Sequence, residues 1–457
     1  MAARDRTRFA PRGTAHAIGV AIALATGCGT PSSSMDAAIE FADVVPPPIR
    51  TAPPAAPSSG DDPSFTVTAR HWLMAGDPLT PRDERYEITV AAPAGTRAVD
   101  AWIDTSPGVR LDARADGTFH ALIDAPSIGD HTVLLAADGH DAAFASRALH
   151  VSAALYAIVS VDWDDSDPGD ANLLRMERLR EHHAGLVYSQ FLGPYVLTDP
   201  ATTADRKRAL LDWVMRQRAA GDEIGVHIHP RCSFVDTTTV PCRSMPSDVY
   251  PAGDATGYTV IVESYTADEQ TTLLQSSADL FVMNGLPRPT SFRAGGWTAG
   301  AGTLEACERA GYAVESSAFP PETIQSAWGS VELGRWTLAN WGGITQTSQP
   351  YHPSRMHVAS SEPSPTFTVL EIPDNGTLVD YMSGAAMIQV LEANWPGRAT
   401  ALNAPREVQF GLHPGSFSTT YQSRLEEALT EVGHHVYADD SGPVVYARLT
   451  DLTRVWP

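Results

Sequence analysis

The sequence predicts two folded parts, a small all-β domain followed by a larger α/β domain built from βα units. In residues 64–152, short runs of alternating apolar and polar residues are separated by turn residues, which is typical of paired strands. From residue 155 onward, apolar strands alternate with helical stretches such as residues 205–219 and 267–284. This alternation favours a mostly parallel sheet or barrel, in which the carboxyl ends of the strands gather at one rim.

The composition is that of a multidomain globular protein with an acidic surface. The chain has 457 residues, of which 43% are hydrophobic and 19% are charged, and its formal net charge is −22 at pH 7. This length suits two or three domains. A surface of this charge repels nucleic acid, so we expect no nucleic-acid partner, whereas a neutral or cationic partner is compatible with it.

Residues 1–28 resemble an export signal that ends in a lipidated cysteine. A basic region, Arg4 to Arg12, precedes an apolar stretch at residues 17–25 that is too short to span a bilayer as a permanent helix. Small residues then lead into Cys28, as in a bacterial lipobox. We expect an exported lipoprotein of the bacterial cell envelope, held on the membrane through a lipid on Cys28, in the periplasm or at the cell surface.

The domain boundaries follow from shifts in composition. Residues 29–62 are rich in Pro, Ser and Ala and show no hydrophobic period, so we expect a disordered linker. Residues 63–153 predict a small immunoglobulin-like β-sandwich that serves as a structural spacer, with carbohydrate binding as the alternative role. Residues 154–457 then form the α/β domain.

Two of the four cysteines lie close together in a segment rich in Pro and Thr. Cys232 and Cys242 can close a short loop as a disulfide, which an oxidising compartment permits, or remain two free thiols. Cys307 lies in a helical run, where we expect a buried small hydrophobic residue.

Polar residues end four strands of the α/β domain, always on one face. Side chains alternate faces along a strand, so Ser160, Asp162 and Asp164 share a face at the end of an apolar strand. Crowded carboxylates repel each other, and a cation or a shared proton relieves that repulsion. A solvated turn after the strand is the alternative.

The other three strand ends carry two histidines, an arginine and a third histidine. His227 and His229 share one strand face and can reach the same metal ion. Arg293 can orient a carboxylate through paired hydrogen bonds, or form a surface ion pair. His413 can act as a general acid, or be a histidine of the core or rim. At the carboxyl rim of a βα barrel these groups would converge.

This order of motifs resembles the polysaccharide deacetylase family, carbohydrate esterase family four, over residues 155–457. The resemblance implies a distorted (β/α) barrel and a divalent metal ion, most often Zn²⁺ with Co²⁺ or Ni²⁺ as alternatives, bound by an aspartate and two histidines. It implies Asp162 as the catalytic base and Asp164 as a metal ligand, or alternatively Asp164 as the base and Asp165 as the ligand. His227 and His229 match the two metal-binding histidines, with one residue between them where the family has three.

The resemblance extends to the remaining motifs. Arg293 looks like the arginine that orients the base, and His413 looks like the histidine that supplies the acid. Trp297, Tyr351 and His352 lie in loops of the same region, where aromatic and imidazole rings suit a sugar-binding pocket.

Together these features predict a metal-dependent hydrolase that removes N-acetyl or O-acetyl groups from an extracytoplasmic polysaccharide. One alternative is a glycan-binding lipoprotein with a catalytically degenerate enzyme fold, and another is a glycosidase on a similar barrel, which needs two carboxylates flanking a sugar bond. A third is a purely structural surface protein, which would bind no metal.

Overall fold

The computed structural model describes residues 45–457, apart from Pro246 and residues 251–253. The predicted export signal, the predicted lipidation site Cys28 and residues 29–44 of the predicted linker lie outside the described residues. Within the described part of the chain, no helix combines the length and the hydropathy needed to cross a bilayer.

The first folded part consists of two β-sheets that enclose a common apolar core. The first sheet is antiparallel and has the order β1 (Thr66–Ala69), β3 (Arg85–Ala91), β7 (Thr118–Asp124), β6 (Asp112–Ala113). The second has the order β2 (Trp72–Met74), β9 (Ala145–Ser152), β8 (Gly129–Ala137), β4 (Val99–Ile103), β5 (Val109–Arg110), and only its β2–β9 pair is parallel. Alternate residues of β3, from Tyr86 to Val90, are buried in the core, as the period of two predicts. The all-β part is therefore present, and the immunoglobulin-like assignment stays a prediction.

The second part is a curled sheet of eight parallel strands. Seven follow the order β15 (Leu370–Glu371), β14 (Val314–Glu315), β13 (Ser291–Ala294), β12 (Glu223–Ile228), β11 (Tyr188–Leu192), β10 (Leu155–Asp162), β16 (Arg406–Leu412), and β17 (Val444–Tyr446) also pairs with β10. A segment after β15 adds a parallel bridge from Leu378 to Gly411 of β16. The expected distorted barrel is thus present in a coarser form, as a curled parallel sheet.

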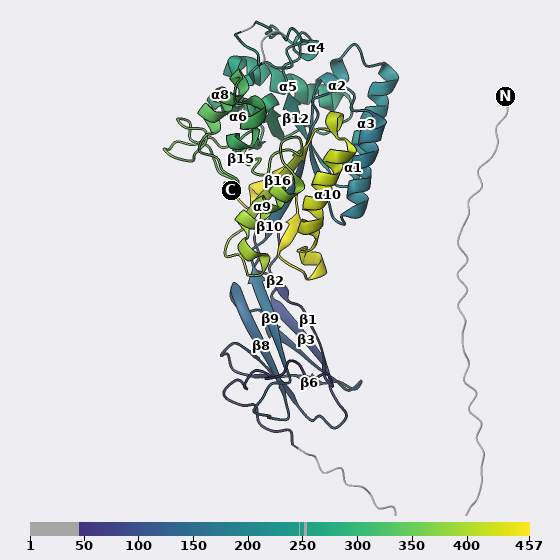
Figure 1. The fold of residues 1–457 in the computed structure, drawn as a ribbon, viewed down its shortest axis with the longest axis vertical. Helices are drawn as coiled ribbons and strands as arrows, with labels where there is room; N and C mark the ends of the chain where they lie inside the picture. The colour runs from purple at the N-terminus through teal and green to yellow at the C-terminus, as the bar shows by residue number, and fades with distance from the viewer. Residues whose placement is uncertain (1–44, 246, 251–253) are drawn as a thin grey trace, which may run out of the picture. The chain divides into compact units, whose positions relative to one another are not determined.

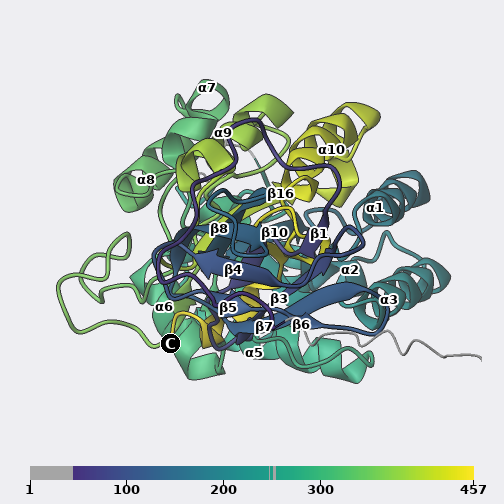
Figure 2. The same ribbon diagram turned by 90° about the horizontal axis from the view of Figure 1, so that it is seen from below.

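Helices lie around the outside of this sheet (Figures 1 and 2). The longer ones are α1 (Asp170–His182), α3 (Ala204–Ala219), α5 (Ala267–Met283), α6 (Ala301–Ala310), α8 (Glu332–Trp341), α9 (Gly384–Asn394) and α10 (Thr419–Gly433), and the single-turn ones are α2 (Tyr195–Thr198), α4 (Cys232–Val235) and α7 (Gln325–Trp328). Local sequence sets several boundaries. Thr266 and Glu269 form a reciprocal capping box at the start of α5, and Gly311 adopts a left-handed conformation at the end of α6.

The central strand β10 shows how the fold positions polar groups. Its odd-numbered residues, such as Val159 and Val161, belong to the large apolar core that includes the helices. Its even-numbered residues face the other way, where Tyr156 and Ile158 pack in a separate inner cluster. The next two on this face are Ser160 and Asp162, so the interior changes from apolar to polar toward the carboxyl end of the strand.

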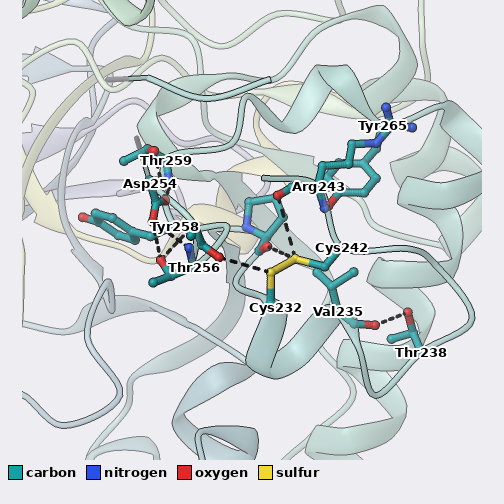
Figure 3. Close-up of a disulfide and its surroundings, with 12 residues drawn as sticks. Cys232, Val235, Thr238, Cys242, Arg243, Asp254, Thr256, Tyr258, Thr259 and Tyr265 are labelled. Carbon is teal, nitrogen blue, oxygen red and sulfur yellow. Dashed lines mark hydrogen bonds between the residues drawn. A yellow bond between two sulfur atoms is a disulfide. The ribbon is translucent and has the colours of Figure 1, made fainter. Parts of the chain in front are cut away.

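The loop after β12 contains the predicted disulfide. Cys232 and Cys242 are joined, with their Cα atoms 5.2 Å apart (Figure 3). Cys307 is free and buried in α6, as the sequence predicts. Cys232 lies shortly after His229 in the sequence, so the cross-link restrains the chain segment that follows this histidine.

Candidate active site

A pocket of about 260 Å³ opens at the carboxyl ends of β10, β12, β13 and β16. Parallel strands bring their carboxyl ends to one edge, which is why residues from distant parts of the sequence meet there. The pocket is lined by five of the polar residues that the strand pattern singles out: Asp162, Asp164, His227, His229 and His413.

Three of these residues form a cluster with the spacing of metal ligands. One ligand atom from each of Asp164, His227 and His229 lies within 4.8 Å of the other two. Asp164 Oδ1 lies 3.0 Å from His227 Nε2 and 3.3 Å from His229 Nε2. Both imidazoles are buried. Two nitrogen ligands and one oxygen ligand suit Zn²⁺ and similar ions.

The hydrogen bonds behind the histidines fix which ring nitrogen faces the pocket. His227 Nδ1 lies 3.0 Å from the carbonyl oxygen of Arg293, and His229 Nδ1 lies 2.6 Å from that of Tyr258. A carbonyl oxygen only accepts, so each Nδ1 carries the proton and each Nε2 is left with a free lone pair. Burial also lowers the pKa of His229, which favours the neutral ligand form. The residues present therefore fit a divalent ion.

Asp164 remains ionised at the centre of this cluster. Burial by itself would raise the pKa of its carboxyl group, but the positive charge of His413 is the largest opposing influence, and the pKa lies well below its usual range. An anionic oxygen ligand is therefore ready for a cation.

Asp162 is held by a buried arginine, as expected from the strand pattern. Arg293 is fully buried, and its Nη1 lies 3.1 and 3.2 Å from the two carboxylate oxygens of Asp162 and 3.0 Å from Ser160 Oγ. Its Nε donates to the carbonyl oxygen of Ser316 at 2.7 Å. The guanidinium group therefore has a fixed orientation, and it presents Asp162 to the pocket.

A second carboxylate beside Arg293 has no signal in the sequence pattern. Asp374 Oδ2 lies 3.4 Å from Arg293 Nη1 and accepts a hydrogen bond from Trp297 Nε1 at 3.1 Å. Burial raises the pKa of Asp374 to about 6, against the opposing charge of Arg293. Asp374 follows the short strand β15 in an irregular segment, where no periodicity indicates its direction.

His413 is paired with a carboxylate that the sequence analysis also missed. Its Nδ1 lies 3.1 Å from Asp380 Oδ2, and its Nε2 lies 3.6 Å from Asp164 Oδ2. Ser416 Oγ donates to the other oxygen of Asp380 at 2.9 Å. Burial alone would lower the pKa of His413, but the charges of Asp164 and Asp380 raise it to about 10. His413 is therefore a protonated imidazole held in a set orientation.

Two further residues that the sequence predicted, Asp165 and Trp297, also line the pocket. Asp165 lines the pocket but lies outside the cluster of Asp164 and the two histidines, so the geometry favours Asp164 as the carboxylate ligand. Trp297 lines the pocket and stacks on Phe319 with ring centroids 4.3 Å apart.

The structure does not bring Tyr351 or His352 to the pocket. The hydroxyl group of Tyr351 donates to the carbonyl oxygen of Val358 at 2.7 Å, and His352 Nδ1 lies 3.1 Å from that of Val369. Both side chains are thus hydrogen-bonded to nearby backbone and do not line this pocket, and their role as substrate-binding residues stays a prediction.

Aromatic side chains from separate segments of the chain line the pocket instead. Trp328 Nε1 donates to the hydroxyl group of Tyr381 at 3.0 Å, and the ring of Tyr250 meets Trp328 edge-on at 6.3 Å. The ring of Tyr381 also lies 6.0 Å from that of Trp297. Aromatic rings in this arrangement offer apolar faces to a ligand in the pocket. We call these four residues the aromatic wall.

The chain was compared with known proteins by sequence and by structure, and only solved structures are similar to it. No family model matches the chain, and no curated protein matches it in sequence. Similar solved structures include a protein from Mycobacterium smegmatis assigned as a polysaccharide deacetylase, with 14% identity, TM-score 0.38 and coverage of 66% of this chain and 90% of that one. A family 4 carbohydrate esterase from Streptomyces lividans has 9% identity, TM-score 0.32 and coverage of 65% and 94%. The 4-alpha-glucanotransferase of Thermococcus litoralis has 10% identity, TM-score 0.37 and coverage of 65% and 39%.

Polysaccharide deacetylases, which the sequence motifs resemble, are thus also among the similar solved structures, at low identity. An enzyme with another activity is among them too. The argument about chemistry therefore rests on the residues of the pocket.

The first prediction concerns the metal ligands. We expect about one divalent ion per chain after equilibration with Zn²⁺, measured by elemental analysis, and none in a variant carrying both His227→Ala and His229→Ala. Asp164→Asn should lose the ion, and the matched change Asp165→Asn should keep it, because only Asp164 lies in the cluster. Loss in Asp165→Asn with retention in Asp164→Asn would reverse the assignment of the carboxylate ligand.

Proposed function

We propose that this protein is a metal-dependent hydrolase that removes N-acetyl or O-acetyl groups from an extracytoplasmic polysaccharide. One observation carries the proposal. A single pocket combines a metal-ligand cluster, a carboxylate held by a buried arginine and a protonated imidazole held by a second carboxylate. Metal-assisted acyl hydrolysis needs these three elements: a Lewis acid, a base for water and an acid for the leaving group.

The metal site supports the first of these elements. Asp164, His227 and His229 would hold the ion, and three protein ligands leave at least one coordination position for water or substrate. When bound there, the ion would lower the pKa of a water molecule and polarise the acyl carbonyl group. His227 and His229 keep their Nε2 atoms unprotonated for this purpose through the hydrogen bonds of their Nδ1 atoms.

Asp162 and His413 divide the proton transfers between them. Asp162 accepts a proton from the attacking water while Arg293 keeps its carboxylate in place. The bond between the acyl carbon and the sugar nitrogen or oxygen then breaks. His413 donates its proton from Nε2 to the leaving amine or alkoxide, while Asp380 holds Nδ1. Acetate and the deacetylated sugar are the products, and water supplies the atoms that complete both.

The shape and charge of the protein suit such a substrate. A pocket of about 260 Å³ is smaller than the ~300–1,000 Å³ typical of sites for drug-sized ligands. This size suits a small group such as an acylated sugar ring, and the aromatic wall supplies ring contacts of the kind that sugars make. The net charge of −22 is compatible with a neutral glycan and with a product that carries new amines.

The prediction that tests this function concerns Asp162 and His413. We expect the intact protein with Zn²⁺ to release acetate from N-acetylated or O-acetylated glycans, and Asp162→Asn or His413→Ala to lower kcat by about 10²–10⁴-fold. Both variants should retain one bound ion, because neither residue lies in the ligand cluster. Unchanged turnover in both would overturn the catalytic roles. New reducing ends in place of acetate would indicate a glycosidase, and glycan binding with no product would indicate a degenerate enzyme fold.

The pH dependence of turnover tests the role of Asp380. A general acid must be protonated, so the rate falls as pH rises through the pKa of His413. The negative charge of Asp380 raises that pKa, so Asp380→Asn should lower it and move the alkaline limb of the pH–rate profile to lower pH. Ser416→Ala is the matched control, because it removes a hydrogen bond to Asp380 without removing a charge. An alkaline limb that stays in place in Asp380→Asn would assign the acid to another group.

We also propose that the protein is exported and held on a membrane through a lipid on Cys28. The N-terminal sequence pattern supports this, and the Cys232–Cys242 disulfide is compatible with an oxidising compartment. In the bacterial host, Cys28→Ala should move the protein from the detergent-soluble membrane fraction to the aqueous fraction. Immunoblotting of the two fractions measures this distribution. An unchanged distribution would exclude Cys28 as the anchor.

A further inference from the structure

The loop between β12 and α5 presents a tyrosine to the metal-ligand cluster. Tyr258 lies on this loop, in a turn organised by Asp254 (Figure 3). Asp254 Oδ1 accepts hydrogen bonds from the backbone N–H of Thr256 at 2.8 Å and from its hydroxyl group at 2.7 Å. Asp254 Oδ2 accepts from the backbone N–H of Thr259 at 2.8 Å and from its hydroxyl group at 3.0 Å. Tyr258 is thus flanked on both sides by residues tied to one carboxylate.

The same turn is attached to the start of the disulfide loop. The backbone N–H of Cys232 donates to the carbonyl oxygen of Thr256 at 2.7 Å, and Cys232 is cross-linked to Cys242 (Figure 3). Tyr258 therefore belongs to a segment whose backbone is held at several points.

Tyr258 contacts two of the three cluster residues through three different groups. Its hydroxyl group donates to Asp164 Oδ2 at 2.7 Å. Its carbonyl oxygen accepts from His229 Nδ1 at 2.6 Å, and its ring stacks on that of His229 with centroids 4.3 Å apart and planes at 28°. The guanidinium group of Arg231 lies 4.5 Å from the centre of the tyrosine ring and donates to the carbonyl oxygen of Asp164 at 2.8 Å.

These contacts divide the two oxygens of Asp164 between different partners. Oδ1 faces His227 Nε2 and His229 Nε2, at 3.0 and 3.3 Å. Oδ2 accepts from Tyr258 and lies 3.6 Å from His413 Nε2. A hydrogen bond to the second oxygen of a carboxylate competes with coordination by that oxygen and orients the group, so it favours coordination of an ion through the first oxygen.

We propose that Tyr258 is a positioning residue that keeps Asp164 a one-oxygen ligand and fixes the ring of His229. The proposal rests on the metal site of the proposed function. By keeping Asp164 monodentate, Tyr258 leaves a coordination position open for water and substrate. Without the phenol, Asp164 Oδ2 loses a partner, and the carboxylate turns to offer both oxygens to the ion. The aromatic ring, which a phenylalanine would retain, continues to pack on His229.

The experiment compares Tyr258→Phe with Tyr250→Phe in the intact protein. Tyr250 is a matched control because it is buried, lines the same pocket and, among the described residues, has no hydrogen bond to Asp164. We expect the Kd for Zn²⁺, measured by competition with a chelator, to rise by about 10–100-fold in Tyr258→Phe, because the loss of the hydrogen bond that orients Asp164 outweighs the contact of its second oxygen. In Tyr250→Phe the Kd should stay near the wild-type value. Circular dichroism confirms that both variants are folded.

Substitution of Co²⁺ for Zn²⁺ gives a readout of coordination that a purely structural role would not move. The visible absorption of Co²⁺ weakens as its coordination number rises, so it should weaken in Tyr258→Phe and match the wild type in Tyr250→Phe. A Kd and a Co²⁺ spectrum in Tyr258→Phe equal to those of Tyr250→Phe would overturn the role of Tyr258 and leave the metal site intact. Absence of bound metal in the wild-type protein would overturn both this inference and the proposed function.

Discussion

The buried ion pair between Arg293 and Asp162 is the interaction on which the rest of the site depends. The side chain of Arg293 fixes Asp162 from β13 across to β10, and its backbone carbonyl oxygen fixes the tautomer of His227. One residue thus orients both the carboxylate base and a metal ligand. Breaking a buried pair by removing one partner costs about 3–5 kcal/mol, because it leaves a charge without compensation. Removal of either partner therefore lowers stability to the extent that no other group, such as Asp374 beside Arg293, compensates the remaining charge.

The charges around Arg293 are balanced by protonation of its neighbours. Glu315 and Glu371 are fully buried in adjacent strands, and burial raises the pKa of both carboxyl groups, which favours their neutral forms. Burial also raises the pKa of Asp374, to about 6, which leaves this carboxyl group largely ionised at neutral pH. Asp162 and Asp374 are then the two carboxyl groups beside Arg293, and of the two Asp162 lines the pocket. Several buried acids are in this way compatible with the buried charge of Arg293, and negative charge remains at the pocket, where the reaction needs a base.

The sequence predicted the parts of the site that lie on strands or directly after them, and it missed most of the parts that lie on longer irregular segments. Strand parity and the common direction of parallel strands suffice to bring together Asp162, His227, Arg293 and His413. No such rule acts in irregular segments, whose direction is set by tertiary contacts. For that reason the sequence analysis missed three residues that hold the reactive groups, namely Asp374, Asp380 and Tyr258, and it directed Tyr351 and His352 to a pocket they do not line. The fold class was also predicted from a regular pattern, because apolar strands that alternate with helices indicate a mostly parallel sheet.

His227 and His229 approach one ligand position although only one residue separates them, because strand β12 ends before His229. Side chains two residues apart on a strand share a face but start about 6.6 Å apart, so they do not automatically reach one ion. His229 lies just beyond the end of β12, and its ring centroid lies only 5.0 Å from that of His227. Space for this ring exists because position 295, on the neighbouring chain segment after β13, is glycine: a Cβ atom there would lie 2.6 Å from the His229 ring. Convergence of the two Nε2 atoms on Asp164 therefore depends on the absence of a side chain at Gly295 as much as on the histidines themselves.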